Sequence, residues 1–315
     1  MLKKIPFPLS GVMLGVLGLG NLLESFSPAI KWFCGTLGTV LALVLIAKMI
    51  WDKGALLEAL RNPILASVLG TFPMSLMLLA GYGAALHIPG TLWLWYVAIA
   101  LHIALMLYFT YNFVIKLKIE NVHASYYIVY VGIIIASVTS PDFHTEALGS
   151  VIFWFGFIAY VPLLVLVSYR YLKVRNMESA SKLLFCIFAA PANLCLVGYH
   201  KAIADKSLLV IITLMVVGQL FYLLVLAMLP KLLTKTFFPS YASLTFPLVI
   251  TATELKLTNG ELIARGIHSS VLAVAVKAET IIAVIFVVYA LIRYFNFIFF
   301  EQREQGLGIS TFKPR

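Results

Sequence analysis

The sequence predicts an all-α integral membrane protein. Of its 315 residues, 62% are hydrophobic and only 11% are charged, and the mean hydropathy is +1.00, values far from those of ordinary soluble domains. Apolar runs of about 18–25 residues recur along the chain, which is the length an α-helix needs to cross a hydrocarbon core. Strands of a membrane barrel are shorter and alternate polar with apolar residues, so the pattern excludes that fold.

Ten membrane spans are expected, in a single domain that covers residues 1–315. The connections between them are short, which leaves no room for a separate soluble domain. The first span begins with the basic and apolar pattern of a signal peptide. Because Pro8 and several glycines interrupt it and no cleavage site of small residues follows, we interpret it as a membrane helix. The expected spans are 7–23, 31–51, 64–86, 91–115, 124–140, 146–171, 181–199, 207–229, 239–257 and 271–299.

Positive charge is distributed unevenly over the two sides of this topology. Of the 23 Lys and Arg residues, most fall on the side that holds the N-terminus. By the positive-inside rule both termini are expected in the cytoplasm, in a multi-pass protein of the plasma membrane. Topology therefore explains the formal net charge of +10, and we do not expect nucleic acid as a partner. The basic residues on the opposite side are Lys31, Lys201, Lys206, Lys256 and Arg265.

Odd-numbered and even-numbered spans differ in composition. All five tryptophans fall in even-numbered spans, which are also rich in large apolar residues. The odd-numbered spans carry glycine, serine, threonine and proline, which are favoured where helices approach closely or line a wet cavity. The sequence therefore predicts five helical hairpins in a quasi-fivefold arrangement, with odd spans lining a central pore and even spans outside. The alternative is a solid bundle in which small residues only permit tight packing.

Each odd-numbered span has a helix-breaking residue near its middle. Proline removes a backbone hydrogen bond and clashes with the preceding turn, and glycine also weakens a helix. Kinks are therefore expected at similar depth in all five spans, at Gly15, Pro73, Gly132, Pro191 and Pro247.

Small and weakly polar residues also follow one face of each odd-numbered span at helical spacing. These faces contain no Lys, Arg or Asp, so the expected pore is polar but nearly uncharged. Rapid conduction requires weak binding, and a neutral lining therefore favours fast passage over tight capture. The lining candidates are Gly11, Gly18, Thr71, Ser75, Ala136, Ala189, Asn193, Ser243 and Thr251.

Residues 243–248 read SLTFPL. This segment and the ten-span alternation resemble the tellurite-resistance/dicarboxylate transporter family, which includes bacterial TehA and the plant guard-cell slow anion channels. The resemblance covers essentially the whole chain. It implies a homotrimer in which each protomer has its own pore, blocked near mid-membrane by a phenylalanine that corresponds to Phe246. One departure is that the span 124–140 lacks the mid-helix proline expected from several relatives.

A ring at Phe246 would block a narrow lumen by steric exclusion and dewetting. At roughly 100° per residue, however, Phe246 lies about a quarter turn from the small-residue face of its span, so a straight helix would not direct it at the pore axis. We expect the kink at Pro247 to supply the missing rotation. The alternative is a ring that packs between helices.

These features favour a channel that passes small anions such as chloride and nitrate. The alternative is a carrier, with or without proton coupling, for a C4-dicarboxylate such as malate or an oxyanion such as tellurite or sulfite. A structural membrane scaffold is a third hypothesis. The sequence contains no nucleophile elbow, zinc-binding helix or phosphate-binding loop, and its three cysteines have no metal-ligand spacing. We therefore expect no enzyme activity, no cofactor and no metal.

Several ionisable residues lie within or beside the spans. His102, near the centre of the span 91–115, is interpreted as a neutral imidazole at a helix or protomer contact, with a proton relay as the alternative. Glu254 and Lys256 are interpreted as an anchor at the membrane interface. Lys277 and Glu279 are two residues apart and do not share a helix face, so they are expected to pair locally with other groups or to tune the outer mouth.

Overall fold

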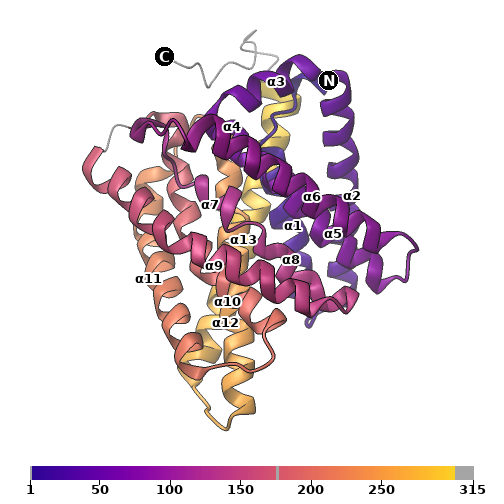
Figure 1. Cartoon of the computed structure of the whole chain (residues 1–315), viewed down its shortest axis with the longest axis vertical. Coiled ribbons are helices and arrows are strands. Elements are labelled where there is room, and N and C mark those ends of the chain that lie inside the picture. The colour runs from indigo at the N-terminus through magenta and orange to yellow at the C-terminus, as the bar shows by residue number, and fades with distance from the viewer. Residues whose placement is uncertain (1, 175–176, 302–315) are drawn as a thin grey trace.

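The computed structural model describes residues 2–174 and 177–301, and this part of the chain is all helix, without strands (Figure 1). Short 3₁₀ and π-helical segments connect or extend the regular helices. The α-helices are α1 Leu9–Leu23, α2 Pro28–Trp51, α3 Lys53–Arg61, α4 Pro63–Val68, α5 Thr71–Ala85, α6 Thr91–Phe109, α7 Tyr126–Tyr130, α8 Ile134–Thr139, α9 Glu146–Tyr169, α10 Pro191–Ala202, α11 Leu208–Leu232, α12 Phe246–Ala264 and α13 Ser270–Asn296.

Seven helical runs in the described residues are long and apolar enough to cross a membrane. The first predicted span contains the shorter apolar helix α1, of 15 residues. The fifth consists of the two short helices α7 and α8, and the ninth begins as a 3₁₀ segment before α12. The chain is therefore a multi-pass membrane protein. The expected ten regular hairpin helices are not found as such, because several spans are each divided into two segments.

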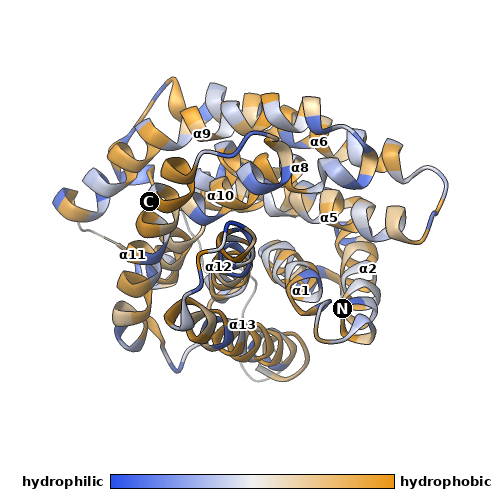
Figure 2. Ribbon diagram, turned by 90° about the horizontal axis from the view of Figure 1, so that it is seen from below, coloured by the Kyte–Doolittle hydropathy of each residue, from blue (hydrophilic) through white to orange (hydrophobic). Residues whose placement is uncertain are grey.

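Buried and lipid-facing helices alternate along the chain. In the view along the bundle, α1, α5, α8, α10 and α12 lie inside, and α2, α6, α9, α11 and α13 surround them (Figure 2). The most apolar windows of Pro63–Ala85 and Ser179–Ala202 are 83% and 89% buried, whereas the outer runs are only 22% to 33% buried. The small residues of the odd-numbered spans thus occupy the interior, where side chains must leave space for neighbouring backbones.

Four inner spans are interrupted near their middle. The 3₁₀ segment Ser179–Ala189 precedes α10, and the 3₁₀ segment Pro239–Leu244 precedes α12. A short turn separates α4 from α5, and another, containing Gly132, separates α7 from α8. Pro73, Pro191 and Pro247 all lie in the first turn of the helix that follows. Proline is tolerated there because its missing N–H would have no intrahelical partner anyway. These prolines therefore mark helix starts, rather than kinks inside continuous helices.

Gly15 does not interrupt its helix, in contrast to the expectation, because α1 is continuous from Leu9 to Leu23. Gly15 instead permits close contact with α12. A Cβ atom at Gly15 would lie 2.5 Å from the Thr245 hydroxyl oxygen and 3.0 Å from the backbone nitrogen of Phe246. The Thr245 hydroxyl in turn donates a hydrogen bond to the Gly11 carbonyl oxygen at 2.9 Å. The break before α12 is thus packed directly on α1.

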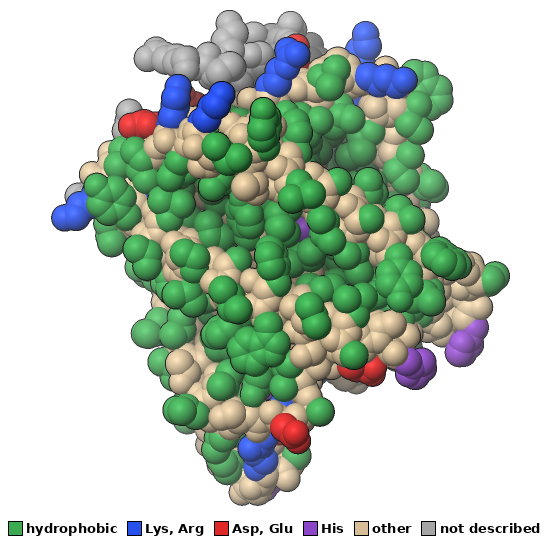
Figure 3. All heavy atoms as spheres, viewed as in Figure 1, with side chains coloured by type: hydrophobic (Ala, Val, Ile, Leu, Met, Phe, Trp, Pro, Cys, Tyr) green, Lys and Arg blue, Asp and Glu red, His purple; other side chains and the backbone are tan. Residues whose placement is uncertain are grey.

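The surface has the polarity expected of a membrane protein. A broad band of hydrophobic side chains crosses the face shown in Figure 3, and Lys and Arg side chains gather along its upper edge. The N-terminal end of the chain and the C-terminal end of α13 lie on this same upper side (Figure 1). This arrangement agrees with an even number of crossings.

The surface helix α3 was not predicted. Asp52 caps it by accepting a hydrogen bond from the Ala55 backbone N–H at 3.3 Å, and Lys48 Nζ donates to the other Asp52 carboxylate oxygen at 2.6 Å. The hydrogen bond from Lys48 is the main reason that the pKa of Asp52 is lowered. The Asp-Lys-Gly sequence directly after an apolar run was the available signal for this cap.

The packing at Gly15 predicts a stability difference between two glycine substitutions. Gly15→Ala should lower the free energy of unfolding by about 1–3 kcal/mol, the usual cost of overpacking, because the Thr245 side chain and the Phe246 backbone must move. Gly260→Ala in α12 is the matched control, since a Cβ there meets nothing within 4 Å. Thermal unfolding in detergent measures both variants. Equal unfolding temperatures for the two variants would contradict the proposed contact.

Candidate functional site

A cavity of about 60 Å³ lies where the inner segments are interrupted. This is room for a few water molecules or a small ion. Every residue that lines it belongs to one of the odd-numbered predicted spans, and the lining draws on all five of them. The lining residues are Pro8, Gly11, Leu14, Ile64, Leu65, Val68, Thr71, Met74, Tyr127, Ile128, Val131, Gly132, Leu184, Ile187, Ala190, Pro191, Leu194, Pro239, Ser240, Ala242, Ser243, Phe246 and Pro247.

The cavity is adjacent to the N-terminal ends of four inner helices. Residues in or directly before the first turn of α1, α5, α10 and α12 all contribute to its lining, including Pro8, Thr71, Pro191 and Phe246. The N-terminus of an α-helix carries a partial positive charge because its first backbone N–H groups point outward without intrahelical partners. No Lys, Arg, Asp or Glu occurs in the lining. The helix dipoles favour an anion over a cation in this otherwise uncharged cavity, although the preceding turns already pair some of these groups: the N–H groups of Ser10, Gly11 and Phe72 bond to the Phe7, Pro8 and Leu69 carbonyl oxygens.

Phe246 lies at the wall of this cavity, at the first residue of α12. Its side chain is 6% exposed. The ring faces α1 at Gly18, where an added Cβ would lie 3.5 Å from Cδ2 and 3.6 Å from Cε2 of Phe246. These are ordinary van der Waals distances, so the ring packs beside Gly18, and the closer neighbour of an added Cβ is Val249 Cγ1 at 3.1 Å.

The orientation of Phe246 depends on Thr245 more than on Pro247. Thr245 has φ −93° and ψ −86°, outside the helical region, and it separates the preceding 3₁₀ segment from α12. The 100° increment of a continuous helix therefore does not apply between Ser243 and Phe246. Both residues line the cavity, although helical spacing placed Phe246 about a quarter turn from the small-residue face of its span.

The cavity wall is apolar, whereas a polar lining was expected. The hydroxyl groups are directed at carbonyl oxygens and at one another. Ser243 Oγ donates to the Ser240 carbonyl oxygen at 2.7 Å, and Thr71 Oγ1 donates to the Val68 carbonyl oxygen at 2.8 Å and lies 2.6 Å from Ser10 Oγ. Such local hydrogen bonds to the backbone are characteristic of serine and threonine in membrane helices. The hydroxyls of Thr71 and Ser243 therefore stabilise the interrupted backbone, although both residues line the cavity.

Of the residues predicted for the pore, one group lies in the cavity lining and another does not. Those in the lining are Gly11, Thr71, Ser243 and Phe246, with the helix-break residues Gly132, Pro191 and Pro247. Gly15 and Gly18 contact α12 just beside it. The others are buried away from it: Pro73, Ser75, Ala136, Ala189, Asn193 and Thr251.

Asn193 and Thr251 form a contact between α10 and α12. Asn193 Nδ2 donates to Thr251 Oγ1 at 2.8 Å and to the Ala189 carbonyl oxygen at 2.6 Å. The Asn193 side chain also packs on α11, where a Cβ added at Gly218 would lie 2.7 Å from its Cγ. Asn193 is therefore directed toward an outer helix.

Several apolar lining residues were not among the candidates, for example Tyr127, Met74 and Leu194. Polarity and small size were the criteria for choosing candidates, and neither selects a tyrosine or a leucine. Ser240 also lines the cavity and was not a candidate, but it is polar. Its hydroxyl is buried and has no hydrogen-bond partner among the described residues. Ser240 lies three residues from Ser243, on the small-residue face of its span, although it was not chosen as a lining candidate.

The ionisable residues differ in their surroundings. His102 is buried, and its Nε2 lies 3.0 Å from the Val129 carbonyl oxygen, which places it at a contact between α6 and α7. Lys256 donates to the Leu22 carbonyl oxygen at 2.7 Å, as expected of an anchor near a helix end. Glu254, in contrast, is fully buried, so the expectation that it forms an interfacial anchor is wrong. Glu279 is also buried, on the face of α13 opposite to the exposed Lys277.

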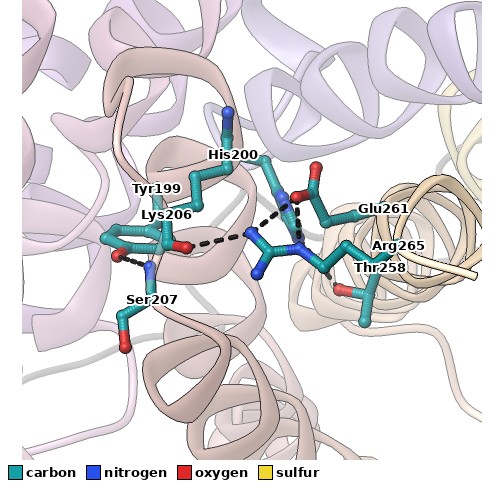
Figure 4. A network of polar contacts seen from close by, with 7 residues as sticks. All are labelled: Tyr199, His200, Lys206, Ser207, Thr258, Glu261 and Arg265. Carbon is teal, nitrogen blue, oxygen red and sulfur yellow. Dashed lines mark hydrogen bonds and ion pairs between the residues drawn. The ribbon is translucent and has the colours of Figure 1, made fainter. Parts of the chain in front are cut away.

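A polar network ties the loop before α11 to the C-terminal half of α12 (Figure 4). Arg265 bonds to Glu261 at 2.8 Å and donates to the Lys206 carbonyl oxygen at 2.9 Å. In the same network, His200 Nε2 lies 3.0 Å from Thr258 Oγ1. The network fixes α12 at the end remote from the cavity.

Comparison with known proteins gives one family. A family model described as a voltage-dependent anion channel matches residues 4–295, which is nearly the whole chain. No curated protein sequence matches this chain.

The Asn193–Thr251 contact predicts an effect on stability that is separate from conduction. Thr251→Val removes the hydroxyl that Asn193 contacts and should lower the free energy of unfolding by about 0.5–1.5 kcal/mol. Thr253→Val is the matched control, because the Thr253 hydroxyl donates only to the Val249 carbonyl oxygen of its own helix. Thermal unfolding in detergent gives the stability difference. Anion flux in liposomes should retain its selectivity in both variants; altered selectivity in Thr251→Val alone would place Thr251 in the conduction path.

Proposed function

The chain belongs to the voltage-dependent anion channel family, the family predicted above as tellurite-resistance/dicarboxylate transporters, and from this premise we propose that it conducts small monovalent anions such as chloride and nitrate. Members of this family are anion channels and transporters rather than enzymes. The proposed path runs through the cavity between the inner helices of one protomer, with the five odd-numbered spans as the wall of a quasi-fivefold pore.

The observation that carries this proposal is the set of helix N-termini around an uncharged cavity. The first turns of α1, α5, α10 and α12 contribute to the lining, which contains no charged side chain. Partial positive charges attract an anion, but each amounts to only about half an elementary charge and is spread over the first turn. A lysine or arginine in the same place would bind the anion more tightly. Conduction requires binding weak enough for release.

The proposed gate is the ring of Phe246. It lies at the cavity wall beside Gly18 and is almost completely buried. A ring in a narrow apolar passage excludes water, and an anion cannot cross a dry constriction without losing hydration. Opening then requires the ring to change rotamer or α12 to shift at Thr245, the residue at which its backbone leaves the helical region.

Assembly and topology complete the proposal. The resemblance to the family supports a homotrimer with one pore in each protomer. The concentration of Lys and Arg on the side that holds the start of the described chain and the end of α13 supports a plasma-membrane protein with cytoplasmic termini.

Replacement of the gate residue tests the function directly. Phe246→Ala should raise chloride and nitrate conductance in planar bilayers about tenfold or more, because loss of the ring removes a barrier of at least ~1.4 kcal/mol. Phe72→Ala is the matched control, since Phe72 is a buried aromatic residue of an inner helix that does not line the cavity. If folded Phe246→Ala protein remains as silent as the wild type, both the gate and the channel are contradicted.

A flux assay separates the channel from a carrier. Chloride and nitrate flux into liposomes should follow the electrochemical gradient and continue when the proton gradient is collapsed. Saturable malate uptake that requires an inward proton gradient, and that falls in His102→Ala, would instead favour the carrier hypothesis. Tellurite and sulfite, tested in the same way, would extend that result to oxyanions.

A further inference from the structure

Two carboxyl groups are buried together at the end of the bundle remote from the chain termini. Glu254 of α12 is 0% exposed and Glu279 of α13 is 5% exposed. The two interact electrostatically, and the side chain of Gln219 from α11 lies beside both of them. Tyr222, one turn further along α11, lies near Glu279. Three helices therefore contribute to one polar cluster in an apolar interior.

Several polar atoms of this cluster are buried and have no hydrogen-bond partner of regular geometry among the described residues. They are Glu254 Oε2, Glu279 Oε2, Gln219 Nε2 and the Tyr222 hydroxyl oxygen. An unpaired buried polar atom costs about 1–3 kcal/mol, so a proton shared between the carboxyl groups, which would pair some of these atoms, is favourable here. The free oxygens of both carboxyl groups are among them.

No cation is bonded to either carboxyl group within the described chain. Lys256 donates to the Leu22 carbonyl oxygen and to Ser25 Oγ, Arg265 is bonded to Glu261, and Lys277 is exposed on the other face of α13. Two carboxylates in one apolar site cannot both ionise without a compensating charge. Other titratable groups on the surrounding helices at this end of the bundle include Tyr199, His200 and Lys201 of α10 and, at the end of α1, Glu24 with its ion-pair partner Lys31.

A hydrogen-bonded path leads from this cluster toward the surface. Thr258 Oγ1 donates to Glu254 Oε1 at 2.8 Å. His200 Nε2 lies 3.0 Å from the same Thr258 oxygen, so the Thr258 hydroxyl joins the imidazole to Glu254 (Figure 4). His200 is half-buried, within the network that joins the loop before α11 to α12. A proton can therefore move between His200 and Glu254 through the threonine hydroxyl.

We propose that Glu254 and Glu279 form a proton-binding site that holds one exchangeable proton, which enters and leaves through Thr258 and His200. The proton neutralises one carboxyl group, and the unpaired Gln219 amide and Tyr222 hydroxyl lie near the carboxyl groups. The site is separate from the cavity at Phe246 and does not depend on the proposed conduction. Glu254 lies on α12, eight residues after Phe246. The charge on this helix, which begins at the cavity, therefore depends on the pH at the end of the bundle where α12 is followed by α13.

Infrared spectroscopy of the purified protein in detergent tests the site without any transport assay. A protonated carboxyl group has a carbonyl stretching band distinct from that of a carboxylate. The wild type should show this band at neutral pH, where exposed carboxyl groups are ionised. The band should shift in D₂O and disappear as the pH is raised. The double variant Glu254→Gln/Glu279→Gln should lack it.

Single variants should change the pH dependence or the D₂O shift of the band without removing it. Glu279→Gln and Glu254→Gln remove the neighbouring negative charge, so the band that remains should disappear at lower pH than in the wild type. Glu146→Gln, at the exposed start of α9, is the matched control and should leave the band unchanged. Thr258→Val should keep the band and slow its shift in D₂O, because the hydroxyl that relays the proton is gone.

Three outcomes would overturn the proposal. The band could be absent at neutral pH in the wild type, it could persist in the double variant, or it could fail to shift in D₂O. A band that is present in choline buffer and absent in sodium buffer would identify a cation site in place of a proton site. Size-exclusion chromatography and thermal unfolding identify misfolded variants, and the wild-type titration alone still decides whether the site holds a proton.

Discussion

The backbone breaks inside the membrane are the constraint on which the rest of the structure depends. A backbone amide or carbonyl group that faces lipid without a partner costs several kcal/mol, so an interrupted helix can exist only where protein surrounds it. The outer helices provide that surrounding layer. At the break before α12, the Thr245 hydroxyl bonds to the Gly11 carbonyl oxygen, and Gly15 leaves the space that Thr245 requires. A small residue on one helix thus permits an irregular backbone on its neighbour.

Helix α12 combines the features that the proposals assign to function. It begins at Phe246 beside the cavity, and two turns further on it carries Glu254 in the buried carboxyl cluster. Between them, Thr251 bonds to the Pro247 carbonyl oxygen within α12 and contacts Asn193 of α10. Glu254 lies near the middle of α12, so a change in its charge bears on the packing of this helix against α10, α11 and α13.

Composition predicted the class of the protein, and alternation of small with large apolar residues predicted which spans are buried, because lipid and protein interiors select different side-chain sizes. The missing N–H of proline predicted an irregular backbone at Pro191 and Pro247, but as kinks inside helices, whereas the structure has helix starts there. Sequence spacing failed wherever contacts between helices decided the outcome. Asn193 lies on the same helix face as Ala189, but its side-chain amide bonds to Thr251 and packs against Gly218 of α11. The position of Glu254 near the end of its predicted span suggested the membrane interface. Helix α12 continues to Ala264, however, and Glu254 is buried within the bundle. Because a 3₁₀ segment precedes Thr245, the direction of the Phe246 side chain could not be predicted from α-helical spacing.

The hydroxyl groups of Thr71 and Ser243 bond to carbonyl oxygens and leave the cavity wall apolar. An anion that enters such a space surrenders water molecules and receives no donor of equal strength in return. The free energy of dehydration then becomes the main difference between one anion and another. Large, weakly hydrated anions lose least on entry. A wall of this kind discriminates by how firmly an ion holds its water, and it does so without a single residue that recognises the ion's shape.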